Sequence, residues 1–416
     1  MRRIGLDYRG VALLAACLSL LGAGDHGSTS AFLSNGLGAR ARGMGGAFVA
    51  IADDTTAGYW NPAGLAFARA PLTQVEMKFD HIALEYTPPG GRGQGNIQHT
   101  LVIPAAGTLI PLQDKRFPSV EILGYVPYGL QLDWDQHAVY RYNVTADQIQ
   151  VLSVGRATSY KANDRFAVGV AAFMNNGKVS LANKVPSTVY AGIPGLPDAA
   201  FAATGDDTSP NVHLGALWLA GKTLRVGAAY RSPIQLTIQG DAHLAIPGGP
   251  IVTDQWNLPL RLPQSASLGA AWQATPVLLV AGQTDWVDWS SIAQQAITFQ
   301  QGALPNQLLP RHWHNRVQPR IGIEYSGYQP LLLRAGYSYD PTPVPASTLD
   351  PLLFDLNRHI VSAGLGTTGR DWSLDVSYEY FFGQPRTTTT SILPFPTNGR
   401  YAGHVNVVTL TINYRK

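Results

Sequence analysis

The side chains with the greatest capacity for polar chemistry are arginines and carboxylates that fall on one side of alternating segments. Four arginines share this side with small and polar residues: Arg225, Arg231, Arg320 and Arg334. A guanidinium can bind a carboxylate through two parallel hydrogen bonds. Two interpretations follow. The arginines receive the carboxylate of a ligand, or they form structural ion pairs with acids on the same side, namely Glu324, Asp340, Asp375 and Glu379.

Other candidate reactive centres are weaker. His312-Trp313-His314 places two histidines two residues apart, but zinc sites need further ligands, and the neighbouring sequence offers no evident set. Cys17 is the sole cysteine, and no G-x-S-x-G motif marks a serine nucleophile. We therefore predict no metal, no cofactor and no catalytic residue. A lipid-modifying barrel esterase with a Ser/His pair on its lipid-facing rim is the enzyme alternative.

The elements that must position the arginines are segments of period two, which begin at residue 72. In 224–231 the residues Leu224, Val226, Ala228 and Tyr230 alternate with a side that carries both arginines, and similar segments recur at 320–326, 333–340, 373–380 and 408–414. A soluble sandwich would show abundant Lys and Glu on its outer face. Here the polar side is mostly Gly, Ser and Arg. We expect the apolar side to face lipid and the polar side to line a lumen.

Composition and connection lengths favour a membrane barrel. Charged residues make up 14% of the chain, well under the roughly 25% of soluble proteins. After the first 30 residues no apolar run of about 18 residues could form a membrane helix, which leaves a closed barrel as the membrane-spanning option. Short turns at 161–165, 220–223, 273–276, 326–330 and 367–371 alternate with long connections at 131–146, 180–208, 243–257, 289–312, 341–355 and 384–400. The predicted fold class is all-β, a 14-stranded antiparallel transmembrane β-barrel over 71–416.

The first 30 residues have the pattern of a secretory signal. Arg2 and Arg3 form the charged region, and residues 11–21 form the apolar region, which contains Cys17. Cleavage after residue 30 lowers the net charge from +3 to +2, because three arginines and two aspartates leave with the signal. The nearly neutral mature chain gives no reason to expect a nucleic-acid partner.

Residues 31–70 form a glycine-rich segment between the signal and the first strand. Gly43, Gly45 and Gly46 permit backbone conformations closed to other residues and close approach to a neighbouring wall. Asp53 and Asp54 offer oxygens to nearby backbone N–H groups. Asn61-Pro62 favours a turn. A surface loop would show the same local pattern.

Motifs in this segment resemble the N-terminal hatch of the FadL family of outer-membrane channels for long-chain fatty acids and other hydrophobic compounds. In the family's order they are Ser34-Asn35-Gly36-Leu37-Gly38, Gly43-Met44-Gly45-Gly46-Ala47, Ala52-Asp53-Asp54 and Asn61-Pro62-Ala63. Later segments such as Tyr230-Arg231-Ser232-Pro233, Leu262-Pro263-Gln264-Ser265 and 334–340 extend the resemblance over nearly the whole mature chain. The resemblance implies that 31–70 is a hatch, or plug, in the lumen of a barrel in the Gram-negative outer membrane.

Two long connections carry more apolar side chains than a water-exposed loop needs. The candidate ligand-binding residues are Val189, Tyr190, Ile193, Leu196 and Phe201 in 180–208, and Phe299, Leu304 and Leu308 in 289–312. These loops could pack on each other as a cap. The resemblance implies instead an external groove that first captures hydrophobic ligands.

The third strand contains Val126-Pro127-Tyr128-Gly129-Leu130. Pro127 cannot donate to a sheet ladder, and Gly129 permits a bulge beside Tyr128. A proline without functional meaning at a strand end is the alternative. In the family that the chain resembles, a kink in this strand opens the wall sideways.

From these features we predict passive uptake of long-chain fatty acids or other hydrophobic compounds, with loop capture, hatch rearrangement and lateral release. The expected partners are a hydrophobic small molecule and outer-membrane lipid, and the expected state is a monomer. A general aqueous porin is the second alternative.

Overall fold

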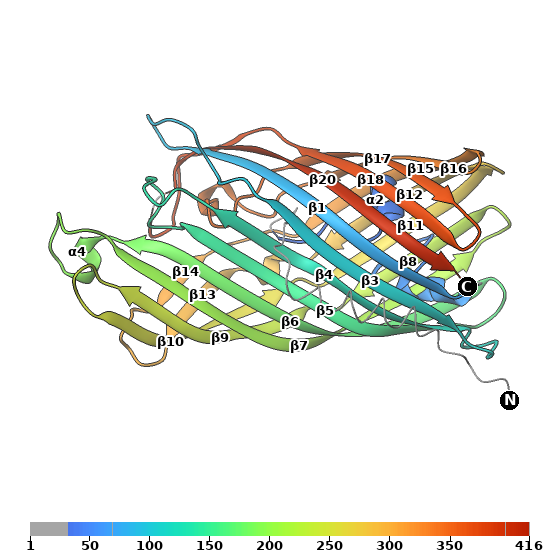
Figure 1. Ribbon diagram of the computed structural model, residues 1–416, viewed down its shortest axis with the longest axis horizontal. Helices are drawn as coiled ribbons and strands as arrows, with labels where there is room; N and C mark the ends of the chain where they lie inside the picture. Colours follow the sequence, from blue (N-terminus) through green and yellow to red (C-terminus); the bar gives the residue numbers. More distant parts are fainter. Residues whose placement is uncertain (1–31, 69, 396, 416) are drawn as a thin grey trace.

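The computed structural model describes residues 32–68, 70–395 and 397–415. The predicted signal, 1–30, lies outside the described residues. The described chain forms a closed antiparallel β-barrel, so the predicted fold class is confirmed. Figure 1 shows its long strands inclined to the barrel axis.

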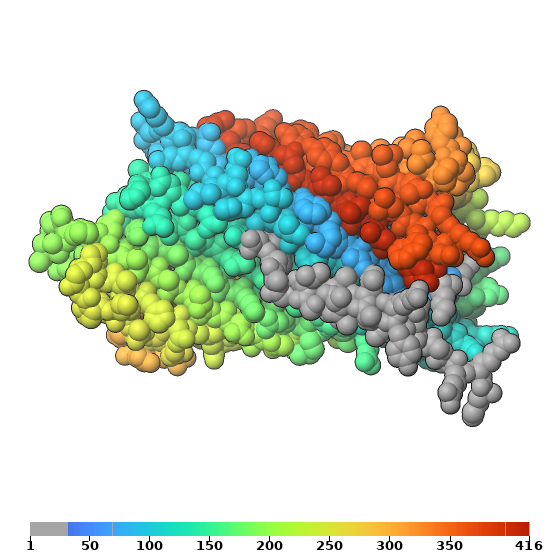
Figure 2. Space-filling view, in the orientation of Figure 1, coloured from blue at the N-terminus to red at the C-terminus, as the bar shows by residue number. Residues whose placement is uncertain are grey.

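The wall contains 14 strands, because β8 continues into β9 and β10 continues into β11. Its elements are β1 (Leu72–Thr87), β3 (Thr100–Pro111), β4 (Ser119–Asp133), β5 (Ala146–Lys161), β6 (Phe166–Val185), β7 (Ala199–Leu219), β8 (Leu224–Arg231), β9 (Ile234–Ala245), β10 (Ile251–Leu262), β11 (Ser265–Thr275), β12 (Leu278–Val287), β15 (Arg316–Tyr328), β16 (Leu331–Asp340), β17 (Arg358–Thr368), β18 (Trp372–Phe382) and β20 (Gly399–Arg415). The barrel closes where β20 pairs with β1, from Leu72↔Arg415 to Thr87↔Arg400. Figure 2 shows this seam on the outer surface, with β20 in red beside β1 in blue.

Tight turns gather at one end of the barrel, here called the turn end, and the other connections gather at the opposite, loop end (Figure 1). The loop end carries the short elements β2 (Gln94–Gly95), α4 (Ser187–Tyr190), η2 (Trp289–Ser291), β13 (Gln294–Phe299), β14 (Gln307–Pro310), η3 (Ala346–Thr348) and β19 (Arg386–Thr388). None of the helices in the described part of the chain has the length and hydropathy needed to cross a membrane.

Three loop boundaries differ from the sequence-based expectation. Strands β6 and β7 remain paired as far as Val185↔Ala199, so the connection predicted at 180–208 shrinks to 186–198. The connection predicted at 243–257 is only 246–250, since β9 and β10 pair up to Ala245↔Ile251. Residues 289–312 are not an open loop, because β13 pairs with β14 and with β10. In each case cross-strand hydrogen bonds extend the sheet through sequence that lacks a lipid-facing apolar pattern.

The predicted orientation of the strand faces holds only for the turn-end half. In β8 the inward residues are Arg225 and Arg231 and the outward ones include Leu224, but in β9 Ile234 and Leu236 are buried while Gln235 is exposed. The switch occurs at 232–233, and β10 and β11 switch in the same way at 263–264. The wall near the loop end therefore has a polar outside and an apolar inside, as expected where it rises out of the bilayer into water.

An apolar belt surrounds the turn-end half of the barrel. Its exposed outward side chains include Val168, Leu214, Leu268, Ile321, Leu365, Leu374 and Val408. Arg156 interrupts this belt. It is exposed on β5, between Val154 and Thr158 on the same face, and lies opposite Ile122 and Ala172. An arginine that faces lipid near the bilayer midplane destabilises a barrel by about 2–4 kcal/mol. A charge at this position is therefore unexpected unless it has a function.

Candidate functional site

Residues 32–68 fill the lumen of the turn-end half, and we call them the plug. They contain α2 (Ala39–Gly43), α3 (Ala57–Trp60) and η1 (Pro62–Phe67). Nearly all of their side chains are buried, and the plug hydrogen-bonds to strands all around the wall, among them β1, β4, β7, β8, β12, β15, β17, β18 and β20.

The predicted plug glycines serve two purposes. Gly45 and Gly46 have φ angles of 66° and 75°, which other residues rarely adopt. Gly43 instead permits close packing, since a Cβ there would lie 3.0 Å from the Cα of Gly364. Substituting any of the three would therefore strain the plug or separate it from β17.

The predicted polar residues of the plug make local and cross-lumen contacts. Asp54 accepts hydrogen bonds from the N–H and hydroxyl of Thr56. Asp53 pairs with Arg40 at 2.6 Å. The Asn61 amide donates to the carbonyls of Val49 at 2.8 Å and Ala216 at 2.9 Å, and its oxygen accepts from the N–H of Ala63. Pro62 opens η1, and Ala63 is fully buried. Asn61 thus ties the plug to β7.

Buried ion pairs dock the plug on β15 and β18. Arg42 Nη1 lies 2.8 Å from Glu379 Oε2, and both side chains are almost completely buried. Arg40 Nε lies 2.9 Å from Glu324 Oε2. Burial alone would lower the pKa of Arg42, but the carboxylates of Glu379 and Glu76 outweigh it and raise the pKa above its ordinary value. Arg42 therefore stays charged and needs its acidic partners.

The structure pairs three of the four predicted lumen arginines with carboxylates. Arg320 Nε lies 2.6 Å from Asp285 Oδ2. Arg334 bridges Glu324 and Asp375, at 2.7 Å each. Arg225 lies 3.6 Å from plug residue Asp53 and is partly exposed. The two other predicted acids pair with different arginines: Glu379 pairs with Arg42 of the plug, and Asp340 pairs with Arg358.

Arg231 is different from the other three. Among the described residues, no carboxylate oxygen lies within 4.0 Å of its guanidinium. Its Nε donates to the carbonyl of Tyr59 at 3.1 Å, and its guanidinium carbon lies 4.0 Å from the centre of the Tyr59 ring. Arg231 is thus a lumen-facing cation held by the plug but not neutralised by an adjacent acid.

The wall is discontinuous at the predicted third-strand segment. The ladder between β3 and β4 ends at Ala106↔Gly124, although both strands continue. On its other side β4 stays paired with β5, but its register shifts between Tyr125 and Tyr128, so that Val126 and Pro127 form a bulge. We call this discontinuity the wall break.

The first plug residues cover the free edge of β4 at the wall break. Phe32–Ser34, here called the N-terminal strand, form an antiparallel bridge between Leu33 and Tyr128. The Ser34 N–H donates to the Pro127 carbonyl at 2.8 Å, and the Gly129 N–H donates to the Phe32 carbonyl at 2.9 Å. Backbone groups facing lipid must be hydrogen-bonded. The N-terminal strand therefore supplies hydrogen bonds to some of the β4 backbone groups that β3 leaves unpaired.

A tiny cavity lies behind the wall break. Its volume is about 20 Å³, and its lining includes Leu33, Pro127, Tyr128, Arg231 and His213. Such a space holds about one water molecule, whereas ligand pockets usually measure about 300–1,000 Å³. The wall break is therefore closed to a ligand in this conformation.

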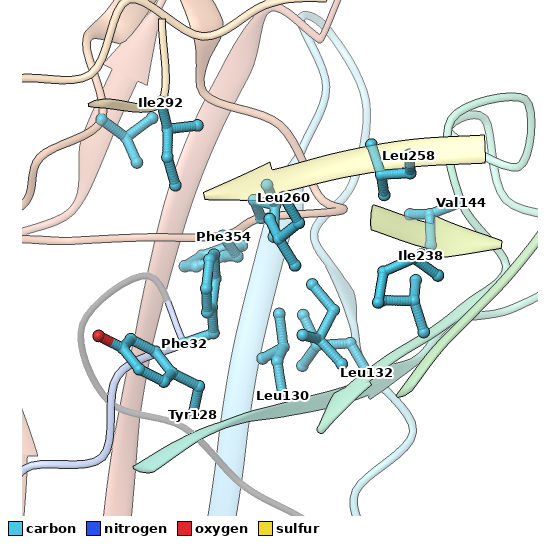
Figure 3. Close-up of a cluster of buried hydrophobic side chains, with 14 of the residues drawn as sticks. Phe32, Tyr128, Leu130, Leu132, Val144, Ile238, Leu258, Leu260, Ile292 and Phe354 are labelled. Carbon is cyan, nitrogen blue, oxygen red and sulfur yellow. The ribbon is translucent and has the colours of Figure 1, made fainter. Parts of the chain in front are cut away.

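Between the plug and the loop end, the lumen is filled by buried hydrophobic side chains, which we call the apolar cluster. Figure 3 shows its members converging from β4, β9 and β10, from the N-terminal strand and from loops between the strands. They include Phe32, Tyr128, Leu130, Leu132, Ile238, Leu258, Leu260, Ile292 and Phe354. Phe32 also packs edge-on against Trp289, with ring centres 5.5 Å apart. The N-terminal strand thus joins the apolar cluster to the wall break.

A larger cavity of about 350 Å³ lies at the loop end, and we call it the outer cavity. Of the predicted loop residues, it brings together Phe201, Phe299 and Leu308, with Trp256 and Phe395 as further aromatic lining. The other predicted loop residues do not line it: Val189, Ile193 and Leu196 are exposed, Tyr190 packs at the edge of the apolar cluster, and Leu304 is buried within it. Its size suits a small hydrophobic molecule.

A third cavity, about 740 Å³, opens at the turn end, on the other side of the plug from the apolar cluster. It is lined by plug residues such as Asp53 and Phe67 and by Lys161, Arg225 and Arg415 from the wall. The plug therefore separates a polar vestibule from the apolar cluster.

The histidine pair lies at the rim of the loop end. His312 and His314 are exposed, while Trp313 between them is buried against Phe32 and Trp289. Within the described ranges, no group of three or more His, Cys, Asp or Glu side chains is arranged to hold a metal ion.

The partners that dock the plug and close the wall break were not predicted from the sequence. Arg40 and Arg42, the only charged residues in 32–52, could have been recognised as counter-charges to lumen acids. Phe32 and Trp313 carried no comparable signal, since their roles depend on contacts with distant strands.

Comparison with known proteins gives a consistent result. A protein-family model described as outer membrane protein transport protein (OMPP1/FadL/TodX) matches residues 26–415. The long-chain fatty acid transport protein of Escherichia coli strain K12 is 25% identical over 89% of this chain and 90% of its own. A Pseudomonas aeruginosa FadL homologue of known structure superposes with a TM-score of 0.82 at 20% identity, covering 92% of this chain and 99% of its own. The Pseudomonas putida toluene transporter TodX gives 0.75 at 18% identity, covering 92% and 98%.

Proposed function

The chain belongs to the OMPP1/FadL/TodX family of outer membrane transport proteins, and from that premise we propose that it takes up long-chain fatty acids or similar hydrophobic molecules through the wall break. Members of this family are transport channels, which excludes the esterase alternative. Passive transport of fatty acids or hydrocarbons across the outer membrane is the function that the family relationship supports.

The observation that carries the proposed route is the wall break. At this point two neighbouring wall strands lose their ladder while both continue, and the plug's own first residues complete the sheet. A covering of three residues can leave without unfolding the barrel. Its departure would connect the apolar cluster to the bilayer.

The route then has three stages. A ligand enters the outer cavity, moves into the apolar cluster as the side chains there rearrange, and leaves through the wall break when the N-terminal strand withdraws from β4. The body of the plug, from residue 39 to residue 67, stays docked by its ion pairs. Transfer of the ligand into lipid, worth about 0.8 kcal/mol per CH₂, supplies the driving force without an energy-coupled step.

Arg231 is the predicted arginine best suited to meet a ligand carboxylate. Arg320 and Arg334 already bind adjacent acids, whereas Arg231 lines the cavity behind the wall break without one. A carboxylate there would compete with the Tyr59 carbonyl for the guanidinium. That competition would couple arrival of the ligand to the plug.

A general porin would need a water-filled path, and the plug opposes one. The outer cavity and the vestibule at the turn end lie on opposite sides of densely buried plug residues. The predicted monomeric state remains part of the proposal.

Deleting Pro127 should abolish this function. Removing one residue between Tyr125 and Tyr128 restores a continuous register with β5. The ladder between β4 and β3 can then extend past Gly124 and close the wall. In a Gram-negative strain lacking its own transporter, uptake of radiolabelled hexadecanoate should fall to the level of cells without the protein.

The control for this deletion is substitution of Pro127 by alanine, which keeps the extra residue and should keep at least half of the uptake. Both variants should show normal heat-modifiable mobility in gels. Wild-type uptake of sugars and ions in place of hexadecanoate would favour the porin instead.

Replacing Phe299 with alanine should weaken ligand capture. The side chain lines the outer cavity and is 7% exposed, so its loss removes apolar contact worth about 1.5 kcal/mol, or roughly tenfold in affinity. Quenching of tryptophan fluorescence by hexadecanoate should therefore need about tenfold more ligand. The matched control is Val189→Ala, outside the outer cavity, where unchanged affinity is expected; equal losses in both variants would refute capture in this cavity.

A further inference from the structure

Arg156 is a charged side chain on a surface built for lipid. Its neighbours in the chain, Gly155 and Ala157, face the lumen, where the Ala157 Cβ lies 3.1 Å from the position of a Cβ on plug residue Gly58. Arg156 therefore faces outward, and no hydrogen bond or ion pair joins it to another described residue. Ionisable residues inside a membrane are rare and usually functional.

Its position relative to the wall break is specific. Arg156 lies opposite Ile122, and two residues further along β4 is Gly124, where the ladder to β3 ends. One strand spacing of about 4.8 Å and two residue rises of about 3.3 Å place these points about 8 Å apart in the wall. An extended arginine side chain can reach across that distance.

The inner side of the same break carries Arg231, which lines the small cavity with Pro127 and Tyr128. Two arginines without carboxylate partners thus flank one discontinuity, one on the lumen side and one on the lipid side. Neither guanidinium has a favourable polar interaction to offer a neutral hydrocarbon. Both suit an anionic oxygen group, which a guanidinium binds through charge-assisted and often paired hydrogen bonds.

We propose that Arg156 is an anion-binding position on the lipid-facing surface, which receives the carboxylate of an amphiphilic ligand as it emerges from the wall break. The inference rests on the proposed function and narrows it, because it gives carboxylate-bearing ligands a binding position at the exit that neutral molecules of the same length do not use. The apolar tail enters the bilayer beside Ile122 and Ala172 while the head group transfers from Arg231 to Arg156.

The test compares two probes that differ only in the head group, radiolabelled hexadecanoate and 1-hexadecanol, in cells that carry the full chain. Arg156→Leu should lower the initial rate of hexadecanoate uptake about tenfold and leave hexadecanol uptake unchanged. Arg156→Lys, which keeps the charge, should retain at least a third of the hexadecanoate rate. Val154→Ala on the same outward face should change neither rate.

Each other outcome has a defined meaning. Equal effects of Arg156→Leu on both probes, or no effect on either, overturn the inference while leaving the proposed function intact. If wild-type cells import neither probe, the proposed function fails and the inference fails with it. A phospholipid phosphate is the other possible anion: if Arg156→Leu loses co-purified phospholipid in mass spectra but imports hexadecanoate at the wild-type rate, the carboxylate assignment is wrong.

Discussion

A disulfide that ties the N-terminal strand to β4 should reduce hexadecanoate uptake to the level of cells without the protein. Leu33 and Tyr128 are bridge partners, and the hydrogen bonds on either side run from Ser34 to Pro127 and from Gly129 to Phe32. This is the non-hydrogen-bonded type of antiparallel pair, with Cα atoms about 4.5 Å apart, which falls within disulfide geometry. The L33C/Y128C variant should therefore cross-link, and reduction should restore uptake.

The mature chain suits this experiment because its sole cysteine, Cys17, lies in the predicted signal. The matched control ties the body of the plug to β3 in the variant T55C/G107C. A Cβ on Gly107 would lie 3.2 Å from the Thr55 Cβ and 2.9 Å from the Thr55 carbonyl oxygen, so the two backbones must move slightly apart to admit the cross-link. We expect this cross-link to leave at least half of the uptake. If the control blocks uptake and L33C/Y128C does not, the whole plug moves and the N-terminal strand is not the gate.

Breaking the ion pair between Arg42 and Glu379 should release the plug. Glu379 is fully buried and accepts hydrogen bonds from Arg42 and from Asn35. Replacing it with leucine leaves a buried guanidinium without its partner, at a cost of about 3–5 kcal/mol to plug docking. Purified Glu379→Leu in planar bilayers should conduct ions at a level that the wild-type protein does not reach, because water enters beside the displaced plug.

A double variant that removes both charges distinguishes loss of the ion pair from the presence of one unpaired buried charge. Replacing both partners of a buried ion pair with apolar residues is often nearly neutral, so Arg42→Met combined with Glu379→Leu should conduct less than Glu379→Leu alone. Heat-modifiable mobility should be normal in both, since β18 keeps its backbone ladders with β17 and β20. A single variant that stays as closed as the wild type would mean that other contacts hold the plug.

The division of the lumen explains how a plugged barrel can serve apolar ligands. The turn-end half holds the plug and the ion pairs that dock it, whereas the loop-end half is lined mainly by apolar side chains. A ligand therefore finds an apolar environment only above the plug. Sideways release is the exit that avoids the polar half.

Much of the fold could be predicted from the sequence because the relevant signals are local. Alternation such as Leu224, Val226 and Ala228 against Arg225 and Gly227 marks a membrane strand within one segment, and tight turns such as 220–223 punctuate the chain. Counting these segments predicted the 14 strands that the structure contains. The inward direction of the lumen arginines follows from the same alternation.

The ends of the loops and the inward faces of the strands were harder to predict from the sequence. The inward face changes from odd to even positions at 232–233 and from even back to odd positions at 263–264. A local pattern does not reveal which side of a strand meets water above the membrane. The same ambiguity led to loop boundaries that were too wide at 180–208 and 243–257.

The sequence by itself determined the strand count and the residue types available inside the barrel. Only the tertiary structure decided that Arg320 meets Asp285, that Arg42 meets Glu379, that Arg231 meets no acid, and that Leu33 pairs with Tyr128. The physical reason is that alternation and turns are set by neighbouring residues. Ion pairing and edge covering depend on the register between strands hundreds of residues apart, which is fixed only when the barrel closes around its plug.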